Sequence, residues 1–233
     1  MLAEGARPAA GMTALALAWH AAPPADDFCD ISGIAALSGI AETAEGLRLG
    51  ALTTLEEMRR AAPLRAHWPA LVALLAGVGS LGVRAQATLG GNLGWTAGDL
   101  APVLLAAGAR IEGEDGLVEA VLLPRDGSRL LAEKIGHRAA FSPTLVTVAA
   151  GFRLEEGRLS GLRLAVGGGP TAPQRLPRAE AALEGANPAA LDWRATGRDL
   201  AQEIAAGEDE LASAAHRARV AGRALAHALA CLA

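Results

Sequence analysis

The sequence is poor in the residues that build metal centres and disulfide frameworks. It has two cysteines in 233 residues, Cys29 and Cys231, which lie near opposite ends without CxxC spacing. They offer neither a disulfide framework nor a zinc or iron–sulfur ligand set, and a reducing cytoplasm fits this usage. The five histidines show no HxxxH or HExxH spacing, and no Ser/His/Asp or Cys/His set indicates nucleophilic catalysis. We therefore expect no metal bound by this chain.

Basic clusters and long apolar runs are also missing. The 21 basic residues are scattered in a chain of net charge -4, so nucleic acid is not an expected partner. The apolar stretch at 67–83 is interrupted by one proline and three glycines and is too short to span a membrane. Glu4 lies where a signal peptide would be basic, which argues against export. A 52% hydrophobic fraction is ample for the core of a cytoplasmic globular protein.

The first half of the chain is predicted to alternate between helices and strands. Thr53 and Thr54 are each followed three residues later by glutamate, the capping-box pattern that begins a helix. The next helix has one apolar face, formed by Leu71, Leu74, Leu75 and Val78. Strict apolar–polar alternation over 83–89 then predicts a half-buried strand. Asp99 is expected to cap a further helix that ends near residue 108.

The second half is predicted to be a small sheet followed by helices. Strand patterns occupy 109–112 and 117–123, and a polar break at 124–129 follows them. We place a domain boundary in that break, giving domains at 1–125 and 128–233. Residues 145–154 and 159–166 flank a turn and read as a hairpin, and helices are expected at 177–184, 191–206 and 208–232. The fold class is therefore α+β with two domains.

Three glycine- or alanine-rich segments are candidates for binding phosphate. Residues 77–82 match GxGxxG, but a helix precedes them and a strand is expected after them, the reverse of a Rossmann site. In Thr88–Leu93 two glycines allow close backbone approach, and their amides could form a nest for a diphosphate, joined by the Asn92 side chain. Pro8–Leu15 could wrap a phosphate. A tight turn and an alanine-rich loop explain the last two segments equally well.

The run AGVGSLGVRAQATLGGNLGWTAGDLAPVLLAAGA at 76–109 is similar to the FAD-binding subunits of the molybdenum hydroxylases. This family includes the medium subunits of carbon monoxide dehydrogenase and the flavin domains of xanthine dehydrogenase. The resemblance continues in AGMT at 10–13, LGALTT at 49–54, KIGHR at 134–138 and LAVGG at 164–168. It covers nearly the whole chain, and TLGGNL with the preceding VRAQA is its most specific part.

The resemblance implies an FAD-binding domain of the vanillyl-alcohol-oxidase or PCMH type. A small α+β domain of the CO dehydrogenase flavoprotein C-terminal type would follow it. Two glycine-rich loops would hold the diphosphate, Asp99 would lie near the ribose or adenine, and Val78 near the isoalloxazine or adenine. Lys134, the chain's single lysine, would stabilise the reduced ring at its N1–C2 edge, unless it is an ordinary exposed lysine. The implied cofactor-binding residues are Ala9, Ala10, Gly11, Met12, Thr13, Ala14, Leu15, Val78, Thr88, Leu89, Gly90, Gly91, Asn92, Asp99 and Lys134.

The family resemblance also implies partner chains. A large molybdopterin-binding subunit would carry the molybdenum cofactor, and a small subunit would carry two [2Fe-2S] clusters. Electrons would pass through FAD on this chain to NAD+, a quinone or oxygen. A flavin-free scaffold or assembly subunit, and a free-standing flavin oxidase, are the alternatives.

Several departures from the family pattern bear on whether FAD binding survives. Met12 replaces the second glycine of the first loop, which places a bulky side chain where backbone should approach phosphate. The segments 92–99 and 113–131 are shorter than in the family, which would alter the reach of Asp99 and the closure of the site. The chain also starts where the family already has a strand and most of a helix. We expect either a missing edge element or a misassigned start codon.

Overall fold

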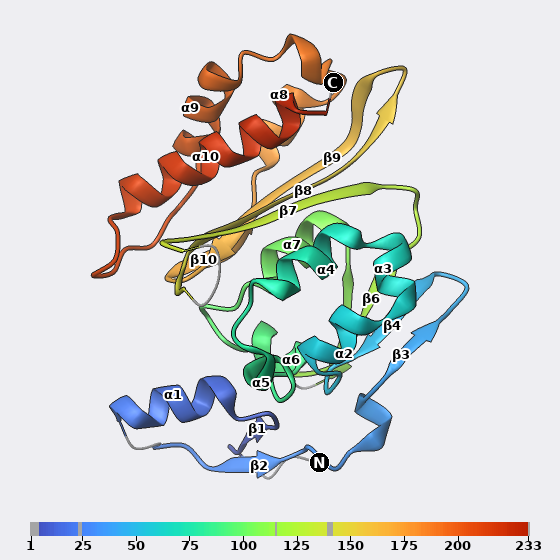
Figure 1. Ribbon diagram of the computed structural model, residues 1–233, viewed down its shortest axis with the longest axis vertical. Coiled ribbons are helices and arrows are strands. Elements are labelled where there is room, and N and C mark those ends of the chain that lie inside the picture. The colour runs from blue at the N-terminus through green and yellow to red at the C-terminus, as the bar shows by residue number, and fades with distance from the viewer. Residues whose placement is uncertain (1–4, 23–24, 115, 139–141, 233) are drawn as a thin grey trace.

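The computed structural model describes residues 5–22, 25–114, 116–138 and 142–232 (Figure 1). An N-terminal unit lies at one end, a helix-rich middle layer follows, and a sheet covered by the C-terminal helices lies at the other end. The N-terminal unit comprises β1 (Arg7–Ala9), α1 (Thr13–Ala21) and β2 (Phe28–Asp30), and β1 pairs with β2 in parallel. In Figure 1 this unit lies below α5 and α6.

The middle layer is built on a four-stranded antiparallel sheet in the order β3-β4-β6-β5. Its strands are β3 (Ile40–Glu42), β4 (Gly46–Gly50), β5 (Arg110–Glu114) and β6 (Leu117–Pro124). Its helical elements are η1 (Ala35–Leu37), α2 (Leu55–Arg60), α3 (Ala62–His67), α4 (Pro69–Ala76), α5 (Leu81–Arg84), α6 (Leu89–Leu93) and α7 (Leu100–Ala107).

The last layer is a second antiparallel sheet in the order β10-β9-β8-β7. Its strands are β7 (Arg129–Gly136), β8 (Thr144–Glu155), β9 (Arg158–Gly168) and β10 (Thr171–Arg175). The elements that follow are α8 (Pro177–Leu183), η2 (Pro188–Ala190), α9 (Trp193–Glu203) and α10 (Ala214–Ala230). No helix in the described ranges has the length and apolar character that crossing a bilayer demands.

The two faces of the second sheet belong to different hydrophobic cores. Successive side chains of a strand point to opposite faces. In β8, Val148 and Ala150 pack with the C-terminal helices, whereas Ala149 between them packs with α4 and α7. The face toward α7 carries small residues, and a Cβ on Gly151 would lie 1.9 Å from the carbonyl oxygen of Ala106. Helix α7 therefore lies close to this sheet, and the middle and last layers share one core.

Most sequence-based elements are confirmed. Thr54 and Glu57 form a complete capping box at α2, and the helix face from Leu71 to Val78 is buried. The hairpin β8–β9 and the three C-terminal helices lie where the patterns placed them, with α10 beginning later than expected. The α+β class is also confirmed. The division into domains at 1–125 and 128–233 stays a prediction.

Two local predictions were wrong. Residues 83–89 do not form a strand, because Ser80 caps the short helix α5 and the chain turns directly from it into α6. The apolar residues at 83, 85, 87 and 89 therefore alternate by chance, in a segment that leads from one short helix into the next. Asp99 stands at the N-cap of α7 but its side chain makes no capping bond. The Asn92 side-chain oxygen accepts the amide of Leu100 instead, at 3.0 Å.

Candidate cofactor-binding site

A cavity of about 480 Å³ lies between the N-terminal unit and the middle layer. One wall is the loop from β1 into α1 together with the first turns of that helix. The opposite wall combines Ala51 and Leu52 after β4, the 87–92 segment and the start of β6. Segments far apart in sequence thus meet around one space of the size that binds small molecules.

The first loop presents backbone amides to this cavity. Thr13, Ala14 and Leu15 line it and form the first turn of α1, whose N–H groups have no partner within the helix. The positive end of the helix dipole lies at the same place, so an anionic group is favoured there. Met12, directly before the helix, has φ 58° and ψ 0°, a left-handed conformation that favours glycine. Its side chain lines the cavity without filling it.

The second loop is held in place by backbone hydrogen bonds to the segment after β4. The amides of Leu89 and Gly90 donate to the carbonyl oxygens of Thr53 and Ala51, at 3.0 and 2.8 Å. In the opposite direction, the amide of Leu55 donates to Ala87 at 2.9 Å. These bonds, made in both directions, hold the second loop against residues 51–55 of the middle layer. Its position is therefore set by the tertiary structure before any ligand arrives.

The two loops touch each other at Gly11. A Cβ built on Gly11 would lie 1.9 Å from the carbonyl oxygen of Gln86 and 3.3 Å from the Cα of Ala87. Only a residue without a side chain allows this approach. The cavity exists in this form because position 11 is glycine.

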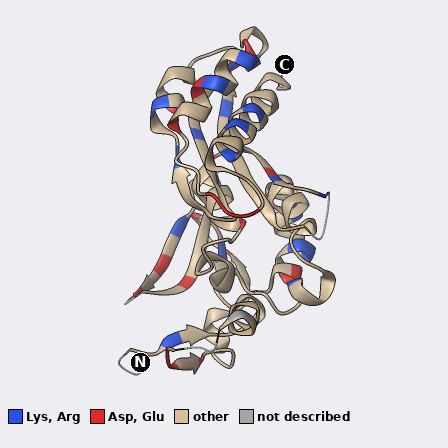
Figure 2. Ribbon diagram, turned by 90° about the vertical axis from the view of Figure 1, so that its left-hand side faces the viewer, with Lys and Arg blue, Asp and Glu red and all other residues tan. Residues whose placement is uncertain are grey.

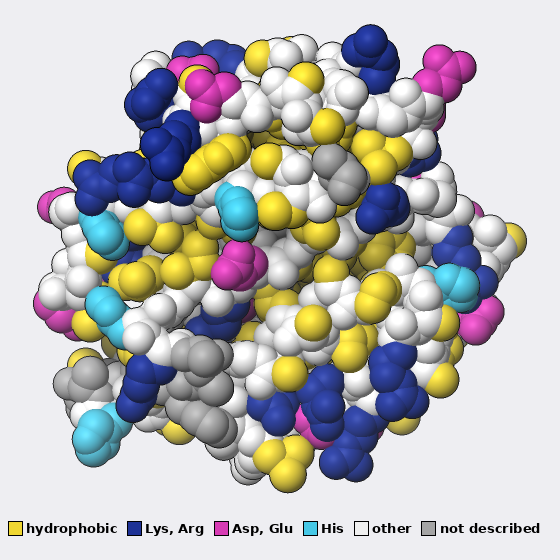
Figure 3. Space-filling view, turned by 45° about the horizontal axis from the view of Figure 1, so that its top comes forward, with side chains coloured by type: hydrophobic (Ala, Val, Ile, Leu, Met, Phe, Trp, Pro, Cys, Tyr) yellow, Lys and Arg dark blue, Asp and Glu magenta, His cyan; other side chains and the backbone are white. Residues whose placement is uncertain are grey.

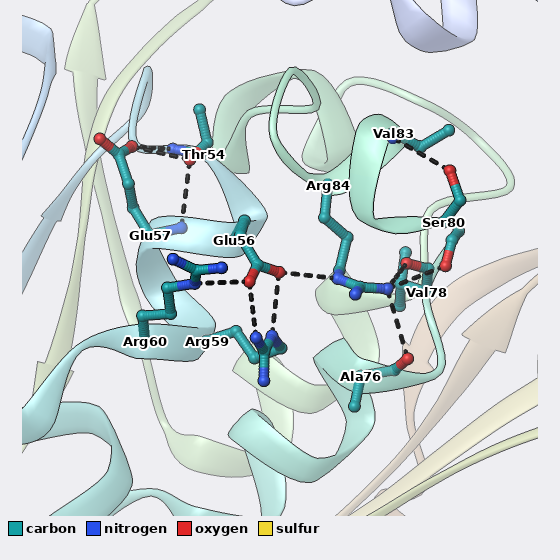
Figure 4. Close-up of polar contacts among 11 residues, drawn as sticks. Thr54, Glu56, Glu57, Arg59, Arg60, Ala76, Val78, Ser80, Val83 and Arg84 are labelled. Atoms are coloured by element: carbon teal, nitrogen blue, oxygen red, sulfur yellow. Dashed lines mark hydrogen bonds and ion pairs between the residues drawn. The ribbon is translucent and has the colours of Figure 1, made fainter.

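A charge cluster centred on the buried Glu56 lies next to the second loop in sequence (Figure 4). Glu56 of α2 binds the guanidinium groups of Arg59, Arg60 and Arg84, with closest N–O distances of 2.6, 2.7 and 3.0 Å. Arg84 also donates to the carbonyl oxygens of Ala76, Val78 and Gly79 at the end of α4. The hydrogen bonds that Glu56 accepts from the three arginines, above all those from Arg59, hold its pKa well below the usual value. The cluster ties α2, α4 and α5 together immediately before the 87–92 segment.

The structure brings eleven of the predicted site residues together around the cavity. They are Ala9, Ala10, Gly11, Met12, Thr13, Ala14, Leu15, Thr88, Gly90, Gly91 and Asn92. Leu89, Val78, Asp99 and Lys134 are not among the residues that line it, and their assignment to the cofactor stays a prediction. Leu89 and Val78 are 0% and 8% exposed and pack into the hydrophobic core.

The structure does not form the amide nest that the sequence suggested at Gly90–Gly91. The amide of Gly90 is bound to Ala51, that of Gly91 to the Thr88 hydroxyl at 3.1 Å, and that of Asn92 to the Thr88 carbonyl. These groups are already satisfied inside the protein. The glycines contribute close backbone approach, and the start of α1 contributes backbone amides that have no partner within the helix.

Asp99 and Lys134 lie in a second polar cluster at the junction of the middle layer and the second sheet. Asp99 is 5% exposed and accepts hydrogen bonds from the hydroxyls of Thr144 and Thr147, at 2.8 and 2.7 Å. Burial raises its pKa above the usual value, while Thr147 and the charge of Lys134 act in the opposite direction. The Lys134 ammonium donates to the carbonyl oxygen of Ser142 at 2.8 Å.

Sequence reasoning missed the residues that line the outer end of the cavity. Trp19 and Phe28 pack edge to face with ring centroids 5.1 Å apart, and the Arg7 guanidinium lies 5.8 Å from the Phe28 ring. Arg7 also binds Asp26 at 2.9 Å, and these two are the charged residues among the described lining. Nothing in the sequence pattern joined them, since the β1–β2 pairing brings them together. Trp95, which follows the second loop, also lines the cavity.

Comparison with known proteins adds to this geometry. The model of the FAD binding domain in molybdopterin dehydrogenase matches residues 2–120, and that of the CO dehydrogenase flavoprotein C-terminal domain matches 133–232. Among solved structures, carbon monoxide dehydrogenase from Hydrogenophaga pseudoflava is similar at 22% identity and TM-score 0.83, over 97% of this chain and 88% of that one.

Two further solved structures share this fold. Reconstituted CO dehydrogenase from Oligotropha carboxidovorans matches at 20% identity and TM-score 0.83, over 95% of this chain and 87% of the other. Quinoline 2-oxidoreductase from Pseudomonas putida 86 matches at 21% identity and TM-score 0.78, over 97% and 88%. The fold, the loop-lined cavity and a family model that spans half of the chain lead to one conclusion. This chain belongs to the family of FAD-binding subunits of the molybdenum hydroxylases and is an oxidoreductase subunit.

Proposed function

We propose that the cavity between the N-terminal unit and the middle layer holds FAD. The single observation that carries this proposal is the contact of Gly11 with Gln86, which closes two distant loops around one space. The residues present fit the cofactor. Free amides at the start of α1 suit the diphosphate, and the apolar and aromatic lining suits a planar ring.

The position of each residue in the cavity suggests its role in binding FAD. The amides of Thr13, Ala14 and Leu15 would bind the diphosphate, and Gly90 and Gly91 would let it approach the opposite wall. Trp19 and Phe28 would exclude water from one end of the site. FAD, when bound, supplies a group that accepts and releases electrons, chemistry that amino-acid side chains do not provide.

At the level of the complex, we propose that this chain transfers electrons. The molybdenum cofactor and [2Fe-2S] clusters would lie on a large and a small partner chain, and an external acceptor such as NAD+ or a quinone would take the electrons. Family membership supports this assignment. The open cavity beside Met12 favours it over a flavin-free scaffold.

A glycine pair offers a matched test of the cofactor site. Gly11→Ala would place a methyl group 1.9 Å from the Gln86 oxygen, whereas Gly33→Ala places one where nothing lies within 4 Å. We expect extracted FAD to fall at least about tenfold in Gly11→Ala. The added methyl group would clash with the Gln86 oxygen, so the two loops must move apart and the residues that contact FAD are displaced. Gly33→Ala should keep wild-type FAD content. Equal FAD in both variants would contradict the proposed site.

The electron-transfer role is tested on the complex isolated from its own cell through a tag on this chain. Addition of the complex's substrate should bleach the flavin absorbance of wild type, and substrate should have no effect on the isolated flavoprotein chain. Turnover of an organic substrate by the chain alone would instead identify a free-standing oxidase. A complex that is fully active and contains no FAD would support the scaffold.

A further inference from the structure

Four exposed arginines cover the outer side of the two C-terminal helices. Arg194 and Arg198 lie one turn apart on α9, and Arg219 and Arg223 lie one turn apart on α10. We call these four residues the arginine face. Figure 2 shows blue bands along both helices, and Figure 3 shows a group of basic side chains at the upper left, in the region of α9 and α10.

The two helices bring these charges together by crossing very closely. A Cβ on Gly222 would lie 2.4 Å from the carbonyl oxygen of Gly197, and one on Gly197 would lie 3.3 Å from the Cα of Arg223. One turn further along, the Trp193 ring packs edge to face against His227 with centroids 6.0 Å apart. The arginines of the two helices therefore share one rigid surface.

The four arginines of the face have no carboxylate ion pair among the described residues. In the part of the chain that the structure describes, twelve different arginines form an ion pair with a carboxylate. None of the four arginines on this face does so within those same ranges. Arg219 donates instead to the Nδ1 atom of His216 at 3.1 Å. Exposed Asp192 and Asp199 lie near the two arginines of α9 in sequence, but neither forms an ion pair with them in the described residues. Four like charges held together in this way raise the local potential and attract acidic groups.

The surroundings of the face suit a protein partner. Trp193 is 38% exposed, and the Arg194 guanidinium lies 5.3 Å from its ring. Tryptophan and arginine are the residue types most enriched at the energetic centres of protein interfaces. A nucleic acid or a membrane is disfavoured, because a long polyanion would also face the remainder of a chain of net charge -4. Figure 1 places α9 and α10 at the end opposite the cofactor cavity, so FAD does not neutralise this face.

We propose that the arginine face docks a carboxylate-rich surface of a partner protein chain and so assembles the complex. That a partner chain exists rests on the proposed function, whereas the positive charge of the arginine face and its location do not. The interface would be steered by electrostatics and anchored at Trp193. It would hold the partner at the end of the molecule away from the cavity.

The test uses the complex isolated through a tagged wild-type chain and separated by salt into this chain and the remaining chains. Those remaining chains are titrated with wild type and with the double variant Arg219→Glu/Arg223→Glu. We expect the double variant to bind them about tenfold more weakly or worse, because like charges would then face each other. Wild-type affinity should fall steeply as NaCl rises, since the screening length shortens. FAD content and circular dichroism should be unchanged in the variant.

The matched control is Arg65→Glu/Arg158→Glu, which makes the same charge change at exposed positions outside the face. It should bind like wild type. Equal affinity of both double variants, or affinity independent of salt, would overturn the proposal. So would a wild-type chain that isolates without any partner, or one that binds anionic phospholipid vesicles or single-stranded DNA more tightly than the remaining chains. A chain that lacks FAD but still assembles through this face would refute the cofactor site alone.

Discussion

Met12 adopts a backbone conformation that L-residues with side chains rarely adopt. Its φ is 58°, and it lies in the turn from β1 into α1, directly after Gly11, which approaches the backbone of Gln86. Left-handed backbone costs an ordinary residue roughly 1–2 kcal/mol. A methionine at this position therefore has a structural cost at the edge of the cofactor cavity.

Met12→Gly should bind FAD more tightly than wild type. Removing the side chain relieves the strain and lets the loop backbone approach the ligand. The greater freedom of glycine in the unfolded chain offsets part of the gain, so the free energy of unfolding should rise by about 1 kcal/mol or less. FAD titration and urea unfolding measure the two effects. Met12→Ala, which keeps the strain but removes the bulk, separates them. The interpretation fails if Met12→Ala matches Met12→Gly in stability.

The burial of Asp99 predicts a specific pH dependence of the free energy of unfolding. Burial raises its folded-state pKa above the usual 3.8, so the folded protein binds this proton more tightly than the unfolded chain does. The free energy of unfolding contributed by Asp99 therefore falls as pH rises from 3.8 through the raised folded pKa, and is constant above it.

Asp99→Asn should remove this fall in stability with rising pH. The asparagine oxygen still accepts the hydroxyls of Thr144 and Thr147, while the cost of burying a charge disappears. At neutral pH the variant should be at least as stable as wild type. Urea midpoints across the acid range test this, with the exposed Asp199→Asn as control. A slope that persists unchanged in Asp99→Asn would show that another group causes it.

At the scale of elements, α5 and α6 show how tertiary contacts override a local pattern. Alternation over 83–89 favoured a strand, yet the described residues on either side of this segment offer it no continuous strand partner. A strand without a partner leaves its backbone groups unsatisfied. Ser80 and Thr88 instead cap two short helices, and a single bridge joins Thr88 to Thr54.

Arg84 should contribute more to this arrangement than the other arginines of the Glu56 cluster. Its side chain is 11% exposed and binds Glu56 and three carbonyl oxygens, whereas Arg60 is 66% exposed and binds Glu56 alone. Arg84→Gln should therefore lower the urea midpoint clearly more than Arg60→Gln, because it removes the donor from the part-buried carbonyl oxygens of Val78 and Gly79. Because α5 leads into the cofactor loop, FAD content should also fall in Arg84→Gln. Equal midpoints would contradict this assignment.

At the scale of the whole molecule, the described helix and strands of the N-terminal unit have no extensive contact with an element of another layer. A small cluster around Ile31, Leu37 and Leu52 and the approach of Gly11 to Gln86 connect it to the middle layer. The cavity occupies much of the remaining interface. A ligand in that cavity would contact both sides and hold them together.

FAD should consequently protect α1 from hydrogen exchange. Bound ligand stabilises the closed arrangement by mass action, by about 2.7 kcal/mol when its concentration is 100 times the dissociation constant. Exchange at 13–21 should slow as FAD is added and should saturate with the flavin titration. The amides of α10, at the far end of the molecule, serve as the internal control (Figure 1). Unchanged exchange in α1 with FAD fully bound would place the cofactor elsewhere.

The sequence by itself determined the periodic elements, the family resemblance and the two loops. The capping box at Thr54, the buried helix face and the β8–β9 hairpin follow from local spacing, which is why pattern alone predicted them. Only the tertiary structure decided that Gly11 meets Gln86, that the amides of Gly90 and Gly91 are already bonded, and that Asp99 and Lys134 lie outside the cavity. The arginine face likewise depends on a helix crossing at Gly197 and Gly222. The physical reason is that these contacts join residues far apart in the chain, and their partners are chosen by packing rather than by spacing.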